Sequence, residues 1–319
     1  MGILHSCILR LIPNVEVAAL CEKSGMIRRF LKKVFAGVSI VDDVEKLADL
    51  ELDSVYVTTP IPSHFPIVKT IYLKKMARNL FVEKTLANNY PEAQELCNLA
   101  DRLEGVNMVG YLRRFYVTFR KTKELFSQRI IGEVSSFEAY AYSSDFCGVK
   151  QGSSAVNAEG DVLRDLGCYA VDLALWFFGN LQVSSADVKS LGASCQGDCV
   201  DFRVKGFKGL EGKFSVSKCM EGYRMPEVGL SIIGSKGSIT VNDDKVELML
   251  SSGRSSVWYR HDLSDNVPFW LGLPEYYRED LHFVNSVNEG HAAEPSFYEA
   301  SKVDEIISQI EKNAGRNYE

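Results

Sequence analysis

Long apolar runs, basic tracts and a recognisable signal peptide are all missing from this chain of 319 residues. The longest apolar stretch, Leu166 to Gly179, contains Asp172 and is shorter than the roughly 18 residues of a membrane-spanning segment. The formal net charge of −6 argues against nucleic acid as a main partner. We therefore expect a cytoplasmic protein with neither a membrane nor a nucleic acid among its partners.

Cysteines are present, but their pattern favours neither disulfides nor a metal site. The eight cysteines are scattered, and a chain this long does not need disulfide bonds to fold stably, so reduced thiols are expected. Cys195 and Cys199 form the only close pair, and they lack a second pair or histidines at zinc spacing. The sequence therefore predicts no bound metal.

The first third of the chain alternates between short apolar strands and helices. Val15–Glu22 and Ser54–Thr59 are rich in β-branched residues and are predicted to be buried parallel strands. A third strand ends at Glu83, and a fourth is expected from Asn107 to Leu112. Helical stretches are expected at residues 24–35, 44–49, 63–75 and 91–105. This alternation predicts an α/β, Rossmann-like dinucleotide-binding domain over residues 1–113.

The chain opens as a helix at Met1–Ser6, without the strand and glycine-rich turn that a dinucleotide fold places before that helix. We therefore expect the first strand and two turn glycines to be missing, and the chain as numbered to bind nicotinamide nucleotides poorly. Gly2 fits the last glycine of such a turn, because Glu22 follows it by the 20 positions expected for the acid that binds ribose hydroxyls.

Lys84 directly follows the apolar strand Asn79–Glu83. Ligands of open α/β sheets bind outside the carboxyl ends of the strands, so a lysine there is a candidate acid, base or clamp. The alternative is a strand-end lysine that simply reaches water. The position alone does not separate the two interpretations.

Beyond residue 113 the strands become longer and alternate between apolar and polar residues. Gly212–Lys218 places Phe214 and Val216 on one face and serines and a lysine on the other. The segment Leu230–Val241 is predicted to be a strand, a glycine turn and a second strand. Residues 114–319 are therefore expected to form an α+β domain with a large, open, mostly antiparallel sheet.

A predicted helix within Gly160–Gly179 carries the second group of candidate residues. At about 100° per residue, Asp165, Tyr169 and Asp172 share one stripe. A solvated helix edge is the competing interpretation. Gly167, costly by about 1 kcal/mol inside a helix, favours a close approach by another group.

Four motifs of this chain resemble the glucose-fructose oxidoreductase, inositol dehydrogenase and rhizopine-catabolism (Gfo/Idh/MocA) family of nicotinamide-dependent sugar oxidoreductases. Thr59–His64 resembles the family's T-P-x-x-x-H loop, Glu83–Thr85 its E-K-P motif, and Gly160–Gly179 its G-G-x-x-x-D-x-G-x-H-x-x-D-x-x-x-W helix. Ile233–Gly237 is similar to its G-x-x-G hairpin. Their order makes the resemblance specific over almost the whole chain.

Three departures from the family pattern stand out. Besides the missing first strand and glycines, Thr85 replaces the proline of E-K-P, and Tyr169 occupies the usual histidine position. Some branches of the family carry tyrosine at that position. The tyrosine is therefore compatible with the family's chemistry.

The resemblance implies an NAD(P)-dependent oxidoreductase that transfers a hydride between a nicotinamide cofactor and a secondary alcohol or ketone of a sugar or cyclitol. We expect Tyr169 to be the acid-base group, Lys84 its electrostatic partner, since an ammonium favours a nearby phenolate, and Asp165 an orienting carboxylate. The first two roles could be exchanged. The expected cofactor-binding residues are Gly2, Glu22, Thr59, Pro60, His64, Glu83, Lys84 and Arg113.

Several alternatives stay open. His64 could instead be a first-turn residue of a helix capped by Ser63, and Asp172 is expected to be a supporting residue. Glu22 favours NAD over NADP, because a carboxylate repels the extra phosphate. The same fold also serves NAD-dependent glycosidases and could serve a binding protein without turnover. The polar sheet face is expected to form a homo-oligomer interface.

Overall fold

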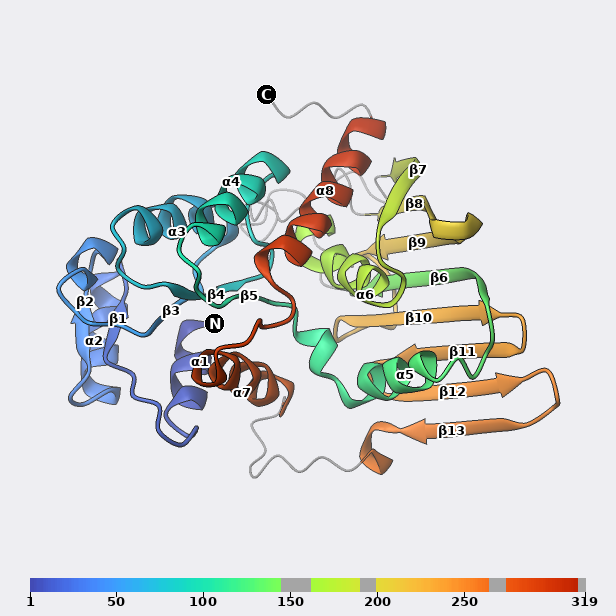
Figure 1. The fold of residues 1–319 in the computed structure, drawn as a ribbon, viewed down its shortest axis with the longest axis horizontal. Helices are drawn as coiled ribbons and strands as arrows, with labels where there is room; N and C mark the ends of the chain where they lie inside the picture. The colour runs from blue at the N-terminus through green and yellow to red at the C-terminus, as the bar shows by residue number, and fades with distance from the viewer. Residues whose placement is uncertain (145–161, 190–198, 264–273, 315–319) are drawn as a thin grey trace. The chain divides into compact units, whose positions relative to one another are not determined.

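The computed structural model describes residues 1–144, 162–189, 199–263 and 274–314 (Figure 1). Contacts divide the chain into two compact units, Met1–Gly110 with Phe269–Asp304, and Tyr111–Pro268 with Glu305–Glu319. The boundary therefore lies after Gly110 and not at the predicted residue 113. A C-terminal segment returns to the first unit.

The first unit contains two parallel sheets. β1 (Ala19–Cys21) pairs with β2 (Ser39–Val41), and β4 (Asn79–Glu83) lies between β3 (Ser54–Val57) and β5 (Asn107–Gly110). The parallel pairing confirms the predicted α/β architecture. β1 is shorter than the strand predicted at residues 15–22, because only three residues of that segment pair with β2.

Helices flank these strands, and two of them begin at a residue whose side chain caps the helix. The Ser24 hydroxyl accepts the Ile27 N–H, and the Asn89 side chain accepts the Glu92 N–H at 3.0 Å. The segment from Val44 forms a short 3-10 helix instead of an α-helix. The helical elements of this unit are α1 (Gly2–Leu9), α2 (Gly25–Val34), η1 (Val44–Leu47), η2 (Ile61–Ser63), α3 (His64–Leu73), α4 (Tyr90–Asp101), α7 (Pro274–Glu289) and the start of α8 (Phe297–Asn313).

Helix α7 explains why a C-terminal segment belongs to the first unit. It packs beside α1, and Figure 1 shows the two helices together below β3–β5. Phe283 of α7 makes edge contacts with Phe81 of β4 and Tyr56 of β3, with ring centroids 5.8 and 5.4 Å apart. Burial of these aromatic rings stabilises the first unit with residues far apart in the sequence.

The second unit is built on an eight-stranded sheet with the order β13-β12-β11-β10-β6-β9-β8-β7. All neighbouring strands are antiparallel except β6 and β9, which confirms the predicted sheet. Its strands are β6 (Val134–Tyr142), β7 (Leu181–Lys189), β8 (Cys199–Gly206), β9 (Glu211–Ser217), β10 (Glu227–Gly234), β11 (Gly237–Asn242), β12 (Lys245–Leu250) and β13 (Ser255–Tyr259).

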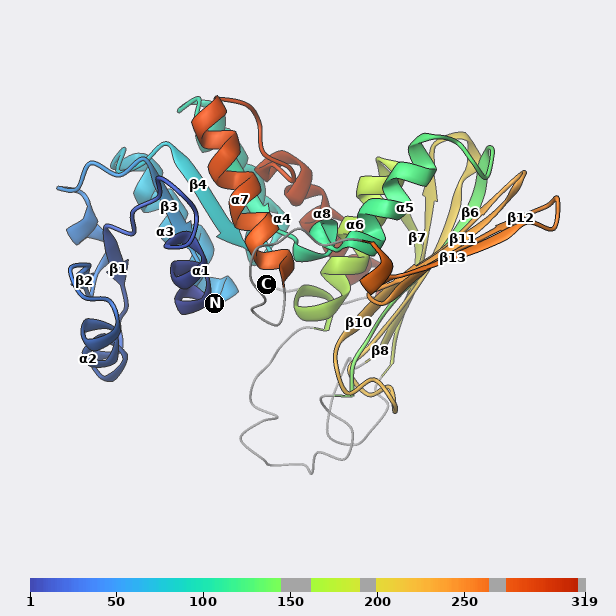
Figure 2. The same ribbon diagram turned by 90° about the horizontal axis from the view of Figure 1, so that it is seen from below.

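Helices cover one face of this sheet. α5 (Val117–Ser127) packs on β11 and β12, and α6 (Cys168–Phe178) packs on β6 and β10 (Figure 2). The shorter helical elements are η3 (Leu112–Phe115), η4 (Leu163–Gly167), η5 (Phe207–Gly209) and η6 (Arg260–Asp262). No helix in the described part of the chain has the length and apolar character needed to cross a membrane.

Candidate functional site

In the first unit, candidate residues gather where β3 and β4 end. Thr58, Thr59 and Pro60 follow β3, and Lys84 follows β4. Because β3 and β4 are parallel and adjacent, these residues lie at the same edge of the sheet. Gly2 also reaches this edge, since a Cβ added to it would lie 2.9 Å from Thr58 Oγ1. The start of α1 therefore lies against the β3 loop.

His64 links the two strand-end loops. Its Nε2 lies 2.7 Å from the Thr59 carbonyl oxygen, and its Nδ1 lies 2.8 Å from the Thr85 carbonyl oxygen. Burial lowers the pKa of His64, so the neutral ring donates its single N–H to one carbonyl at a time. Ser63 stands at the N-cap of α3 and His64 is its first residue, as the alternative expected, but the Ser63 hydroxyl donates to the Pro60 carbonyl at 2.6 Å instead of capping the helix.

Glu83 is held by a second histidine. His5 Nε2 lies 3.0 Å from Glu83 Oε1, and His5 Nδ1 lies 2.8 Å from Asp280 Oδ1. The Lys84 N–H donates to Glu83 Oε2 at 3.2 Å. Lys84 itself is half-buried, and its peptide bond to Thr85 is cis. Two buried histidines therefore hold the segment around Lys84.

Glu22 directly follows β1, at the carboxyl end expected for a ribose-binding acid. Its Oε1 accepts the Ser24 N–H at 2.7 Å, so the carboxylate is held at the start of α2. The Arg28 guanidinium donates to the carbonyl oxygens of Glu22 and Lys23, at 2.8 and 2.6 Å. Both of these arginine contacts use the backbone and not the Glu22 carboxylate.

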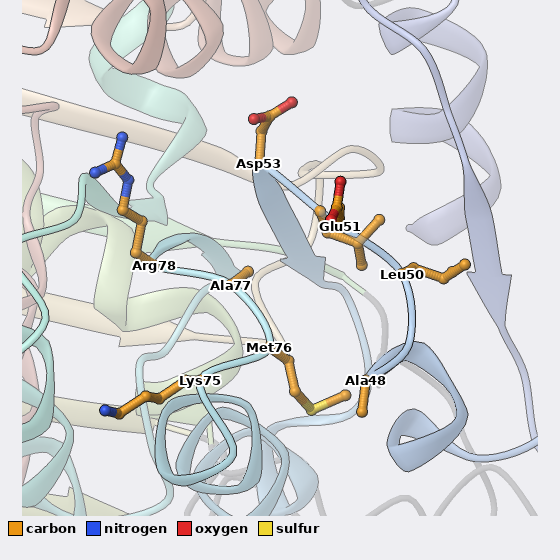
Figure 3. Close-up of a pocket in the computed structure, with 9 residues that line it drawn as sticks. Ala48, Leu50, Glu51, Asp53, Lys75, Met76, Ala77 and Arg78 are labelled. Carbon is orange, nitrogen blue, oxygen red and sulfur yellow. The ribbon is translucent and has the colours of Figure 1, made fainter.

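A pocket lies at the opposite edge of the same sheet (Figure 3). Asp53 and Arg78, which line it, directly precede β3 and β4. Ligands of parallel sheets bind at the carboxyl ends of the strands, whereas this pocket lies at the amino ends. It therefore does not coincide with the candidate residues.

In the second unit, Asp165 and Tyr169 lie near the start of α6. Leu163–Gly167 is π-helical, so the helix turns less per residue there than the 100° assumed for a regular α-helix. Asp165 is exposed and Tyr169 is half-buried, whereas Asp172 is only 1% exposed. Asp172 is therefore buried where Asp165 reaches solvent. The predicted close approach at Gly167 is confirmed, because a Cβ added to it would lie 3.2 Å from the methyl groups of core residue Val216.

Asp172 is paired with a buried arginine. Arg114 Nε lies 2.9 Å from Asp172 Oδ2, and Arg114 Nη2 lies 2.7 Å from Oδ1. Both side chains are at most 5% exposed. This bidentate pair ties α6 to η3, which agrees with the expectation that Asp172 is a supporting residue.

Arg113 lies against the ring of Tyr169, with its guanidinium carbon 5.2 Å from the ring centroid. Arg113 Nε also lies 2.9 Å from Asp243 Oδ1, and Nη2 donates to the Pro226 carbonyl at 3.0 Å. Burial raises the pKa of Asp243 to about 7, although Arg113 acts in the opposite direction. Cofactor binding by Arg113 stays a prediction.

Lys218 is a site residue that was not singled out from the sequence. Its Nζ lies 2.5 Å from Asp165 Oδ2, and its side chain is only 5% exposed. A visible signal was available, because Lys218 directly follows strand β9 just as Lys84 follows β4. His5 gave no comparable signal, since its partner Asp280 lies 275 positions away.

In the first unit, the structure thus places Gly2 against the β3 loop and His64 between the loops that follow β3 and β4. In the second unit it places Arg113 against Tyr169 and Lys218 against Asp165. Among the described residues, no hydrogen bond or ion pair joins Glu22 to either group. Within the described ranges no cluster of three metal-ligating side chains occurs. Cys199 is a free thiol, and Cys195 lies outside the described residues.

Two family models match this chain. A model described as an oxidoreductase family with an NAD-binding Rossmann fold matches residues 7–111. A model of the GFO/IDH/MocA C-terminal domain matches residues 119–240. Together they cover most of both units.

Individual proteins are similar to it over parts of their length. The chain is 30% identical over 148 residues to trans-1,2-dihydrobenzene-1,2-diol dehydrogenase of Xenopus tropicalis, covering 46% of this chain and 43% of that relative. It is 24% identical over 180 residues to D-glucoside 3-dehydrogenase of Escherichia coli K12, covering 56% and 50%. The chain spans about half the length of the curated relatives it matches.

Solved structures share the fold over almost the whole chain. Levoglucosan dehydrogenase in complex with NADH has a TM-score of 0.87 at 18% identity, covering 99% of this chain and 94% of that chain. An oxidoreductase from Agrobacterium radiobacter in complex with NAD+, L-tartaric acid and magnesium has a TM-score of 0.85 at 18% identity, covering 98% and 93%.

Proposed function

Because this chain belongs to the Gfo/Idh/MocA family of NAD-binding oxidoreductases, we propose that it transfers a hydride between a nicotinamide cofactor and a secondary alcohol of a sugar or cyclitol. The observation that carries the proposal is the placement of Lys84. This lysine directly follows a central parallel strand, and Glu83 and His64 hold its backbone on both sides. A lysine held at that edge is suited to act on a bound substrate.

The residues of the first unit fit a dinucleotide. Gly2 lets the start of α1 lie close to Thr58, where a side chain would collide. Helix N-termini provide N–H donors for phosphate groups, and the Glu22 carboxylate suits ribose hydroxyls. We propose that Thr59, Pro60, His64, Glu83 and Lys84 complete the binding loops, with Arg113 as a further contact.

When bound, the nicotinamide accepts the C–H hydrogen of the alcohol together with its electron pair. The hydroxyl proton must pass to a side chain, and we assign this role to Tyr169, with Lys84 as the charged partner. Arg113 packs against the Tyr169 ring and limits its orientation. Asp165, held by Lys218, is positioned to accept hydrogen bonds from substrate hydroxyls.

Single-turnover hydride transfer tests these assignments. NAD is mixed with myo-inositol, levoglucosan and a D-glucoside, which are substrates suggested by the relatives' names. Lys84→Ala and Tyr169→Phe should each lower the rate by about 10² to 10⁴. The matched controls are Lys205→Ala and Tyr298→Phe, which change exposed side chains. Unchanged rates in both site variants would contradict the proposed site.

The same assay separates the alternative functions. Net formation of NADH from a simple sugar indicates an oxidoreductase, whereas glycoside cleavage without net NADH indicates a redox-neutral glycosidase. Failure to bind either nucleotide in a titration would indicate a protein without turnover. We also propose a cytosolic location, supported by the free thiols of the described cysteines.

We further propose that the helix-free face of the sheet joins two copies of the chain. One row across this face runs Arg203, Lys213, Glu138, Ser231, Thr240, Glu247 and Val257. Arg203 and Lys213 lie at one end of the row and Glu247 toward the other, while Glu138 pairs with Lys213 within the chain. A two-fold related copy would bring the basic end of one row to the Glu247 end of the other. Light scattering should give a dimer or larger assembly, and Ser231→Arg should weaken it, while Gln94→Arg in the first unit should not.

A further inference from the structure

We propose that His5 and Asp280 are positioning residues for Lys84, acting through the carboxylate of Glu83. This inference rests on the proposed function of Lys84. Three segments of the first unit meet here: α1 supplies His5, β4 ends at Glu83, and α7 supplies Asp280. His5 is 1% exposed, and the Asp280 side chain is fully buried.

The two acids that flank His5 favour a cation between them, and although burial raises the pKa of Asp280, its hydrogen bond to His5 acts in the opposite direction. One His5 nitrogen faces Glu83 and the other faces Asp280, at 3.0 and 2.8 Å. A neutral imidazole has a single N–H and would satisfy one carboxylate, whereas an imidazolium donates to both. Burial alone would lower the pKa of His5, but the bonds to Asp280 and Glu83 outweigh it and raise the pKa to about 10.

The other groups around His5 do not supply a competing cation. The rings of Tyr56 on β3, Phe81 on β4 and Tyr276 on α7 surround the imidazole at centroid distances of 5.2 to 5.8 Å. Burial holds the pKa of Tyr56 well above its usual range, so its phenol is neutral. Glu279, next to Asp280 on α7, adds a further buried carboxyl group.

The Glu83 carboxylate links His5 to the backbone of Lys84. With Oε1 bonded to His5, its other oxygen, Oε2, accepts the Lys84 N–H at 3.2 Å. His64 holds the next residue through the Thr85 carbonyl at 2.8 Å. The imidazolium fixes the orientation of the Glu83 carboxylate, and the carboxylate fixes the backbone from which the Lys84 side chain extends. A misplacement of about 1 Å can lower a rate about 10²-fold.

The test is a double-mutant cycle on steady-state hydride transfer with NAD and the substrate panel above. His5→Gln and Asp280→Asn should each lower kcat about 10- to 100-fold while KM for the substrate stays within about threefold. In the Lys84→Ala background the same changes should have no further effect on kcat. His291→Gln, the same replacement on an exposed histidine of this unit, should leave kcat unchanged.

The outcomes separate this inference from the proposed function. A wild-type rate in Lys84→Ala would contradict the proposed function, whatever the His5 variants do. If Lys84→Ala lowers kcat but His5→Gln leaves kcat unchanged in the unaltered chain, or lowers it equally in the unaltered chain and in the Lys84→Ala background, the positioning role alone would be overturned. If the variants fail to fold, ¹⁵N-histidine NMR of the unaltered chain decides: one of its five histidines should remain an imidazolium at pH 8.5, and its absence would overturn the inference.

Discussion

Replacing Asp172 with alanine should destabilise the second unit strongly. The change leaves the Arg114 guanidinium, whose side chain is 5% exposed, without the carboxylate that accepts three of its hydrogen-bond contacts. Removing one partner of a buried ion pair costs about 3–5 kcal/mol, because the remaining charge stays desolvated. That loss is a large fraction of the about 5–15 kcal/mol that holds a typical domain folded.

Urea unfolding followed by tryptophan fluorescence provides the measurement. Trp176 lies over Arg114, with the ring centroid 5.7 Å from the guanidinium carbon, so its emission reports on this region. With a slope of about 1–3 kcal/mol per molar urea, the midpoint should fall by about 1 M or more.

Two comparisons make the prediction specific. Asp187→Ala breaks an exposed pair with Lys189 and should leave the midpoint nearly unchanged, because exposed pairs are screened by solvent. The double change Arg114→Met with Asp172→Leu should recover most of the loss, because no unpaired charge remains. An Asp172→Ala midpoint equal to that of Asp187→Ala would refute the reasoning.

Three further predictions concern other parts of the chain. Burial raises the pKa of Asp243 from 3.8 to about 7, so between these two pH values the folded chain binds more protons than the unfolded chain. The stability contributed by Asp243 therefore falls as the pH rises toward 7. Asp243→Asn should therefore flatten the pH dependence of the urea midpoint between pH 4.5 and 8, and an unchanged slope would contradict the assignment. Glu22→Gln should weaken NAD more than NADP in a calorimetric titration, since the carboxylate suits ribose hydroxyls and repels a phosphate; equal losses for both nucleotides would argue against the ribose role. Gly212→Ala would place a Cβ 2.2 Å from the Phe137 ring and should cost about 1–3 kcal/mol in thermal unfolding, whereas Ser215→Ala on the other face of β9 should change little.

Local patterns were sufficient for much of the fold. Apolar, β-branched runs predicted the parallel strands β3 and β4, and alternation predicted the antiparallel strands β9 to β12. The helix starts near Ser24 and Pro91 were also visible in the sequence, and the structure shows the Ser24 and Asn89 side chains capping them. The position of Lys84 after β4 was also visible, since a strand's end can be read from its own residues.

Other features depended on contacts between distant segments. The pairing of His5 with Asp280 and the return of α7 to the first unit give no pattern along the sequence, because they join residues about 200 or more positions apart that meet only in the fold. The π-helical segment before α6 differs from the regular geometry assumed for a helix, and the pairing of Asp172 with Arg114 joins residues 58 positions apart. The sequence by itself determined where most strands and helices lie and the family, whereas tertiary packing decided which charges are buried and which residues hold Lys84 in place.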